Sequence, residues 1–180
     1  MGAAPVSCYF LTDKIFVHGY FPEYARIAAE LGPSARICEV GVQTGESLRM
    51  WQSLFPMGQV TGVDHAEDAT WPPETTRVIS DQANPALGSL GPFDLVVDDA
   101  SHDGDLTRRT FEILWPRVAA GGFYVVEDWF FGLEPWTATG GDPGMLEVVA
   151  GFLRMLDGKT ALESVSYRYG MAVLRKKTAG

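Results

Sequence analysis

Carboxylates and one histidine follow two apolar segments of the chain. Asp98 and Asp99 end the segment FDLVVDD, and His102 lies three residues past Asp99. Glu127 and Asp128 end the later apolar segment FYVVED. Neighbouring parallel strands lie about 4.8 Å apart. If the two segments are such neighbours, Asp99, Glu127 and Asp128 converge on one point.

Three carboxylates at one point repel one another unless a cation or a proton lies between them. A site for a hard cation with oxygen ligands resolves this repulsion, and Mg²⁺ there keeps waters or substrate oxygens in its remaining positions. We therefore predict Asp99, Glu127 and Asp128 as metal ligands. His102 can act as a neutral base on a hydroxyl that the metal makes more acidic. The alternative is that these acids cap helices and that His102 is structural.

A second candidate group lies in the loop EVGVQTG at residues 39–45. Gly41 and Gly45 permit a tight turn and close approach to a ligand, and the next helix offers free N–H groups at its start. The middle glycine of a dinucleotide fingerprint is missing. Glu39 at the head of the loop suits a ligand that carries an ammonium group. The alternative is a glycine turn that binds nothing.

Asp64 ends the next apolar segment, about 20 residues after the loop, where an acid can bind both hydroxyls of a ribose. The alternative is an acidic helix cap. The loop and the acid together, on successive segments, predict a cofactor that contains ribose. His65 follows Asp64 and is a weaker candidate for stacking near an adenosine.

Helical and strand patterns alternate along the chain, which favours an α/β fold. Apolar spacing predicts helices at residues 22–31, 47–55 and 105–118, and a last helix that begins at Asp142 and Pro143 and buries Met145, Val149, Phe152 and Leu156. Strand patterns occupy residues 35–40, 59–64, 77–80, 93–99, 123–128, 162–167 and 171–175. Parallel strands need crossovers, so the sheet is predicted to be doubly wound and mostly parallel, with an antiparallel hairpin that turns near Gly170.

Length and composition fit one domain with a real core, since the chain has 180 residues of which 46% are hydrophobic. We predict a single domain over residues 1–180. Residues 1–34 form an N-terminal segment and helix, residues 35–128 the cofactor-binding core, and residues 129–180 an acceptor loop, a helix and the closing hairpin.

The formal net charge of −9 disfavours nucleic acids and anionic membrane surfaces as partners. The sequence shows no run of about 18 apolar residues and no signal-peptide pattern, so we expect a cytoplasmic protein. Cys8 and Cys38 do not form a disulfide framework or a zinc site. The sequence leaves open whether the chain forms a homo-oligomer.

The motifs ICEVGVQTGESLRMW, VTGVDHAED and FDLVVDDASH resemble those of the class I S-adenosylmethionine-dependent methyltransferases. Together with TDKIFVHGY near the start, they resemble the branch that holds the macrolide-sugar O-methyltransferases of the mycinamicin type and proteins described as cephalosporin hydroxylases. The similarity runs from about Thr12 to Asp128. It implies a Rossmann-like fold and S-adenosylmethionine as the cofactor.

The resemblance also assigns roles within the cofactor site. Glu39 and Gly41 would lie against the methionine part, Asp64 would hold the ribose, and Asp81 and Gln82 would lie by the adenine. The first loop is less rich in glycine than is usual in the family. The remaining predicted cofactor residues are Gln43, Gly45, Ser47, His65 and Asp98.

For the chemistry, the resemblance implies metal ligands at Asp99, Glu127 and Asp128 and a base at His102. The expected reaction is Mg²⁺-assisted O-methylation of a hydroxyl on a small-molecule sugar or natural-product acceptor. Ala100 stands where glycine is commoner in the family. The branch carries an extra N-terminal domain that the short segment ahead of the cofactor loop does not match. Metal and base are therefore expected to persist while the acceptor differs.

Two other functions stay open from the sequence. One is a binding module that holds S-adenosylmethionine without catalysis. The other is a hydroxylase, which is disfavoured because a facial iron triad needs two histidines and only His102 lies in the acidic group. His18 and Tyr20 either close over the cofactor or substrate or belong to a surface loop. The aromatic segment 129–136 either covers an acceptor or forms a lid or a subunit contact.

Overall fold

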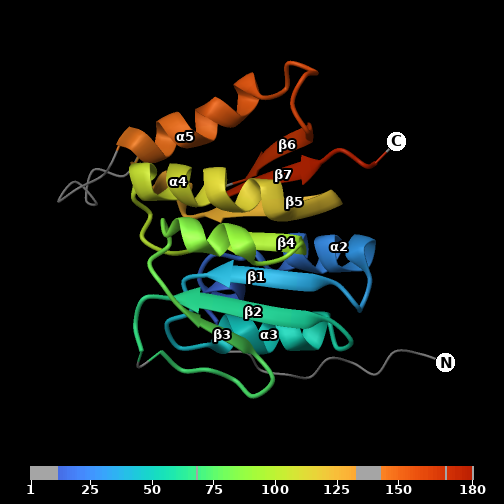
Figure 1. Cartoon of the computed structure of the whole chain (residues 1–180), viewed down its shortest axis with the longest axis vertical. Coiled ribbons are helices and arrows are strands. Elements are labelled where there is room, and N and C mark those ends of the chain that lie inside the picture. Colours follow the sequence, from blue (N-terminus) through green and yellow to red (C-terminus); the bar gives the residue numbers. More distant parts are fainter. Residues whose placement is uncertain (1–11, 68, 133–142, 169, 180) are drawn as a thin grey trace.

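Seven strands form a single sheet in the order β3-β2-β1-β4-β5-β7-β6 in the computed structural model (Figure 1). The structure describes residues 12–67, 69–132, 143–168 and 170–179. The strands are β1 (Arg36–Val40), β2 (Gln59–Asp64), β3 (Thr76–Ile79), β4 (Phe93–Asp98), β5 (Val118–Glu127), β6 (Leu162–Arg168) and β7 (Met171–Lys176).

The first five strands run parallel, and β7 pairs antiparallel with both β5 and β6. This confirms the predicted mostly parallel, doubly wound sheet with a C-terminal hairpin. Strand order reverses between β1 and β4, which lie side by side although β2 and β3 separate them in sequence. Ligands of such sheets bind outside the carboxyl ends of the strands at this switch point.

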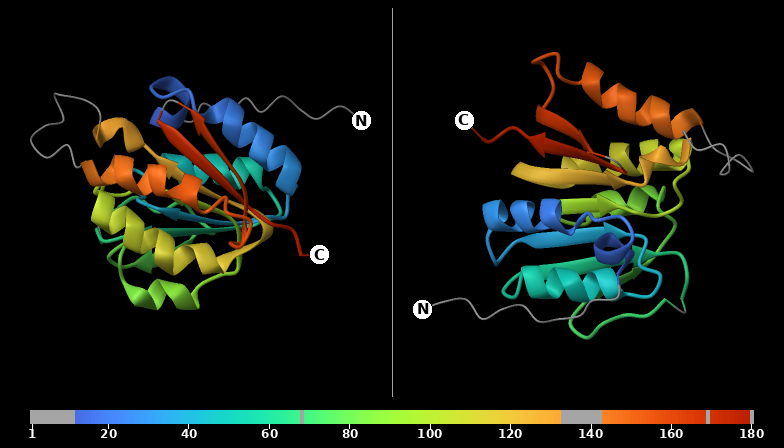
Figure 2. Two further views of the ribbon diagram at one scale, coloured as in Figure 1. Left: turned by 90° about the horizontal axis from the view of Figure 1, so that it is seen from above. Right: turned by 180° about the vertical axis from the view of Figure 1, so that it is seen from behind.

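Helices cover both faces of the sheet (Figure 2). One layer contains α1 (Asp13–Phe16), α2 (Phe21–Leu31) and α3 (Glu46–Leu54). The opposite layer contains η1 (Pro85–Ser89), α4 (Gly104–Leu114) and α5 (Pro143–Arg154). Two further 3₁₀ turns, η2 (Trp115–Arg117) and η3 (Trp129–Gly132), flank β5 in sequence.

Each face of the sheet has its own hydrophobic core because successive strand residues point to opposite faces. Ile37 packs with Tyr24 and Trp51 on the α2–α3 side. Cys38, the next residue, packs with Phe111 and other residues on the α4–α5 side. The same alternation decides which way the acids within the strands, Glu39, Asp98 and Glu127, point.

The predicted end of the helix over 105–118 and the predicted start of the strand that follows it are wrong. The helix ends at Leu114, and β5 already begins at Val118. Pro116 has no N–H for a further helical turn, so the chain makes the 3₁₀ turn η2 instead. Gly121 and Gly122, predicted to end the connection, lie inside β5, where the β4–β5 register shifts.

Leu156 was predicted to be on the buried face of the last helix, but it lies beyond α5 and its side chain is 44% exposed. Met145, Val149 and Phe152 are buried as predicted. The predicted cap at Asp142 lies outside the described residues. The short helix α1, capped by the side chain of Thr12, was not predicted. The other predicted elements end within one residue of the observed bounds.

Candidate active site

A cleft with a volume of about 910 Å³ opens at the carboxyl ends of the parallel strands. Its walls combine the loop after β1, the ends of β2 and β3, the loop after β4 and the residue after β5. Ten of the predicted site residues line it: Gly41, Gln43, Ser47, Asp64, His65, Asp81, Gln82, Asp99, His102 and Asp128. Four others are not in its lining: Glu39, Gly45, Asp98 and Glu127.

Gly41 brings the first loop against the end of β4. Its φ is +96°, and a Cβ built on it would lie 2.0 Å from the backbone oxygen of Asp99. Any side chain larger than hydrogen is therefore excluded at this position. Gly41 therefore permits a close approach to the backbone of Asp99. This contact fixes the wall of the cleft between β1 and β4.

Asp64 holds the same loop from the other side. Its Oδ2 accepts hydrogen bonds from the backbone N–H groups of Val42 and Gln43, at 2.8 and 3.0 Å, and its Oδ1 accepts one from Ala66 at 2.8 Å. Burial raises the pKa of Asp64, but these three donors outweigh it and lower the pKa. A carboxylate has about four acceptor positions, so roughly one is left for a ribose hydroxyl.

The residues predicted to lie by an adenine differ in their surroundings. Asp81 is exposed, and its Oδ1 accepts from Ala83 N at 2.8 Å. Gln82 is buried, and its amide joins the loop after β4 to α4 through Ser101 N at 3.2 Å and the hydroxyl of Thr110 at 3.1 Å. His65 is 86% exposed at the rim of the cleft. Gln82 therefore positions the wall of the cleft, whereas Asp81 faces solvent.

Glu39 does not line the cleft, and its side chain is fully buried on the side of the sheet that α1, α2 and α3 cover, between Lys14 and Ser47. Its Oε2 accepts a hydrogen bond of 2.6 Å from the hydroxyl of Ser47, which itself lines the cleft. Its Oε1 has no hydrogen-bond partner among the described residues and lies 3.3 Å from Lys14 Nζ. The ammonium group nearest to Glu39 is therefore the chain's own.

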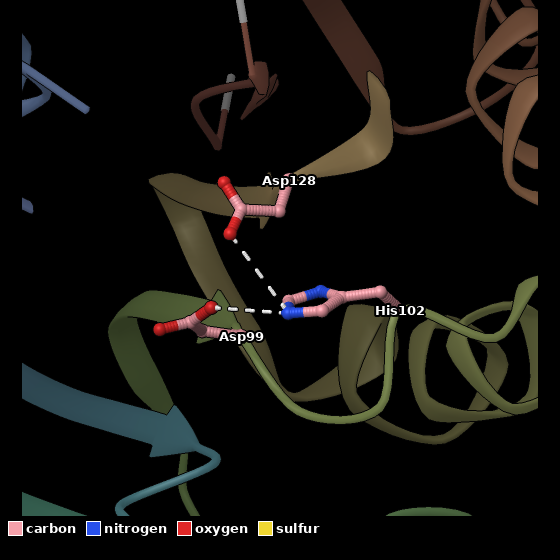
Figure 3. A group of neighbouring side chains, drawn as sticks. All are labelled: Asp99, His102 and Asp128. Atoms are coloured by element: carbon pink, nitrogen blue, oxygen red, sulfur yellow. Dashed lines mark ion pairs between the residues drawn. The ribbon is translucent and has the colours of Figure 1, made fainter. Parts of the chain in front are cut away.

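Asp99, His102 and Asp128 converge at one end of the cleft (Figure 3). The Nε2 atom of His102 lies 3.9 Å from Asp99 Oδ1 and 3.9 Å from Asp128 Oδ2. One ligand atom from each residue lies within 4.8 Å of the other two. Two carboxylates and an imidazole at this spacing can hold a metal ion, and the imidazole can also accept a proton.

The backbone at this site is strained. Four described non-glycine residues have positive φ, and three of them line the cleft: Gln43 at 48°, His102 at 55° and Asp128 at 53°. Such conformations cost about 1–3 kcal/mol each and cluster where surrounding structure enforces a functional geometry. The conformations at His102 and Asp128 accompany the meeting of their side chains between β4 and β5.

Asp98 and Glu127 do not join this group. Asp98 is buried on the α4–α5 side, where it accepts a hydrogen bond of 3.3 Å from the hydroxyl of Tyr124. Burial raises the pKa of Asp98 to about 8. Glu127 points to the α1–α2 side, where the hydroxyl of Tyr24 donates to its Oε1. The alternation of strand side chains separates Asp98 from Asp99 and Glu127 from Asp128, and this signal was available in the sequence.

Lys14 is the site residue for which the sequence predicted no role. It comes from α1, only 1% of its side chain is exposed, and its Nζ lies 2.5 Å from Asp99 Oδ2 and 2.9 Å from Glu127 Oε2. Burial lowers its pKa, but the carboxylates of Asp99, Glu127 and Glu39 outweigh burial and hold the pKa well above its ordinary value. The signal for it was the Asp13-Lys14 pair in TDKIFVHGY, the motif that resembles the macrolide-sugar branch.

Tyr20 and His18 flank Asp128 on the side away from His102. The hydroxyl of Tyr20 donates a 2.6 Å hydrogen bond to Asp128 Oδ1, and His18 Nδ1 lies 3.8 Å from the same oxygen. The two rings stack with centroids 5.1 Å apart. Tyr20 is buried, so it does not belong to a surface loop.

The aromatic segment predicted at 129–136 is described only as far as residue 132. Trp129 packs partly buried against the α4–α5 core, and the ring of Phe130 lies 6.4 Å from that of His18. Trp136 lies outside the described residues. Across the described part of the chain, no helix combines the length and the apolar character that a membrane span requires.

Similarity to known proteins agrees with this geometry. Residues 38–129 match the methyltransferase domain family. The chain is 33% identical over 160 residues to demethylmacrocin O-methyltransferase of Streptomyces fradiae, covering 78% of this chain and 40% of that protein. It is 34% identical over 151 residues to mycinamicin VI 2''-O-methyltransferase of Micromonospora griseorubida, covering 76% and 38%.

A solved structure is similar over nearly the whole chain. It is the MycE methyltransferase of the mycinamycin biosynthetic pathway in complex with Mg, SAH and mycinamycin VI, with a TM-score of 0.77 and 27% identity. The match covers 94% of this chain and 52% of that chain. The present chain thus spans about 40% of the length of the two curated relatives and about half of the solved one.

Proposed function

We propose, since the chain belongs to the methyltransferase domain family, that it transfers a methyl group from S-adenosylmethionine to a hydroxyl of a small sugar or natural-product acceptor. The observation that carries this proposal is the meeting of Asp99, His102 and Asp128 in a cleft that Asp64 also lines. Two curated relatives are named as O-methyltransferases of demethylmacrocin and of mycinamicin VI.

The cleft fits S-adenosylmethionine, which when bound supplies a methyl group on a sulfonium. Its volume of about 910 Å³ lies within the usual range for small-molecule sites. Asp64 offers its remaining acceptor position to a ribose hydroxyl, and Asp81 can accept from an adenine amino group. Gly41 and Ser47 line the part of the wall that we assign to the methionine end.

The acidic end of the cleft fits a divalent cation, which when bound supplies positive charge that makes a nearby hydroxyl more acidic. Asp99 and Asp128 are the residues that would hold it, with an acceptor oxygen and waters completing the site. Mg is bound in the similar MycE structure. Glu127, predicted as a third ligand, has contacts to Lys14 and Tyr24 at both of its oxygens.

We assign His102 as the base. Its Nε2 lies between two carboxylates, which stabilise the imidazolium that forms when it takes the acceptor's proton. Methyl transfer itself requires an in-line approach of oxygen, methyl and sulfur, so the remaining contribution of the protein is positioning. The acceptor oxygen then lies near Asp99 and Asp128 and within hydrogen-bond reach of His102.

The partner class follows from charge and from the cleft. A net charge of −9 offers little attraction to nucleic acid phosphates, so the expected partner is a small-molecule acceptor. We retain the cytoplasm as the expected location and a single domain over residues 1–180 as the expected organisation. A homo-oligomer stays an open prediction.

Methyl-labelled S-adenosylmethionine tests the proposed function. The protein is incubated with a panel of glycosides, once with Mg²⁺ and once with EDTA, and label in the acceptor fraction is counted. Transfer that requires the metal supports the scheme. Cofactor binding without transfer to any glycoside and without a cation effect would favour the binding module. Oxygen uptake with Fe(II) and the same acceptors would favour the hydroxylase.

A further inference from the structure

Lys14 occupies the centre of a buried acidic cluster beneath the cleft. We define this cluster as Lys14, Glu39, Asp99 and Glu127. The Nζ atom lies 2.5 Å from Asp99, 2.9 Å from Glu127 and 3.3 Å from Glu39. Glu39 is fully buried and Glu127 is 2% exposed, and neither lines the cleft, whereas Asp99, at 20%, and Lys14, at 1%, both line it.

The cluster brings together acids from three adjacent strands. Glu39 lies in β1, Asp99 follows β4, and Glu127 ends β5. All three carboxylates approach the lysine, which arrives from α1, 85 residues before Asp99 in the chain. An ammonium ion at this point does what the sequence led us to expect of a metal ion, because it neutralises carboxylates that would otherwise repel one another.

The contacts separate acids whose oxygens are engaged within the cluster from acids that still present an oxygen to the cleft. Both oxygens of Glu127 are engaged, Oε1 by Tyr24 and Oε2 by Lys14. Asp99 is shared, because its Oδ2 contacts Lys14 while its Oδ1 is 3.9 Å from His102. The carboxylate oxygens left for the cleft are Asp99 Oδ1 and Asp128 Oδ2, because the hydroxyl of Tyr20 donates to Asp128 Oδ1.

We propose that Lys14 is a positioning residue that competes with the divalent cation for Asp99 and Glu127 and so keeps cation binding at the cleft weak and reversible. The inference rests on the cation in the proposed function. Lys14 also fixes the rotamer of Asp99 so that one carboxylate oxygen faces the cleft. A weakly held cation leaves room for the acceptor oxygen, which must enter and leave in each turnover.

Removal of the lysine charge should strengthen cation binding. We expect Lys14→Met to bind Mg²⁺ about tenfold more tightly than the unaltered chain, since a positive charge a few ångströms away is lost. Titration calorimetry with Mg²⁺ alone, in the full chain and without cofactor or acceptor, measures this. A purely structural role would weaken binding, because the acids would lose their arrangement.

Lys159→Met is the matched control, because it removes the same charge from an exposed position on the loop after α5. It should change Mg²⁺ affinity less than twofold. If Lys14→Met does not fold, Lys14→Gln gives the same reading, since its amide can donate to the same carboxylates without a charge. Circular dichroism establishes folding for each variant.

Equal or weaker Mg²⁺ binding in the folded Lys14 variants would overturn the proposal. Detectable binding only after the substitution would support it, because the lysine would then hold the cation's place. The methyl-transfer test of the proposed function uses a different readout. A chain that transfers label but shows no effect of Lys14 on cation affinity therefore rejects this inference alone.

Discussion

The two ends of β1 and β4 carry opposite arrangements of charge. At their amino ends, Arg36 of β1 meets Asp94 of β4 through two side-chain hydrogen bonds of 3.0 Å, one cation for one carboxylate. At their carboxyl ends, Lys14 alone meets the three carboxylates of the buried acidic cluster. The first pair is partly exposed and has one cation for one acid, whereas the cluster is buried and has one cation for three acids, and burial raises the pKa of Glu39 and of Glu127.

The backbone conformation also differs between the two ends of the strands, and the strained conformations lie at the carboxyl end. Gly41 and the positive-φ residues His102 and Asp128 lie at the carboxyl edge, where the backbones of the first loop and the β4 end are in close contact. Arg36 and Asp94 lie at the beginnings of β1 and β4, and neither has a positive φ. The comparison teaches that one sheet contains a stabilising edge and an edge where backbone strain and the burial of several acids are tolerated. Such a concentration of unfavourable terms is typical of functional sites.

The largest effect is expected from His102→Asn, because general-base removal costs about 10²–10⁴-fold in rate. Asparagine tolerates the positive φ of this position better than alanine, so the fold should persist. Label transfer under saturating cofactor measures the loss, and equilibrium dialysis with labelled cofactor should show unchanged affinity. Full activity in this variant would refute the role of His102. It would also mean that the strained carboxyl edge of the sheet is not explained by catalysis at His102.

Gly41→Ala is expected to destabilise the fold by about 3 kcal/mol or more, since a methyl group would overlap the backbone of Asp99 in a left-handed conformation. Urea unfolding followed by circular dichroism gives the free energy of unfolding. Gly151→Ala in α5 is the control, because a Cβ there meets nothing within 4 Å. This control should gain up to about 1 kcal/mol from helix propensity. Equal effects at both glycines would contradict the close approach at Gly41.

Asp94→Asn is expected to cost only about 1 kcal/mol at neutral pH, because the pair with Arg36 is partly exposed. Burial raises the pKa of Asp94, but the hydrogen bonds and charge of Arg36 outweigh it and lower the pKa. The stabilisation is therefore complete above the ordinary pKa of about 4 and disappears as pH falls through the lowered value. Thermal unfolding of both proteins from pH 7 to pH 2.5 should converge at the acidic end. A difference that persists there would show that Asp94 acts through packing.

Most of the fold could be predicted because apolar periodicity and strand length are local properties of the chain. The failure at residues 114–122 has a specific cause. Pro116 ended the helix early, and β5 extended backwards through two glycines to pair with Phe93. Whether such glycines end a connection or enter a strand depends on the partner strand, which local patterns do not include.

The acids of the candidate site were predicted as a set, but the predicted set differs from the one that meets. Asp99, His102 and Asp128 converge as expected from their places after β4 and β5. Asp98 and Glu127 are turned away by the alternation of strand side chains. Their roles in cofactor and metal binding stay predictions that the structure does not favour.

The sequence by itself determined which residue types follow the strands, and therefore that acids and one histidine gather at the carboxyl edge of a parallel sheet. Only the tertiary structure decided which charge neutralises them. Lys14 contacts Asp99, which lies 85 residues later in the chain. This contact forms because α1, which directly precedes α2, packs on the face of the sheet to which Glu39 and Glu127 point. A contact of this range depends on packing between layers, and no local pattern encodes it.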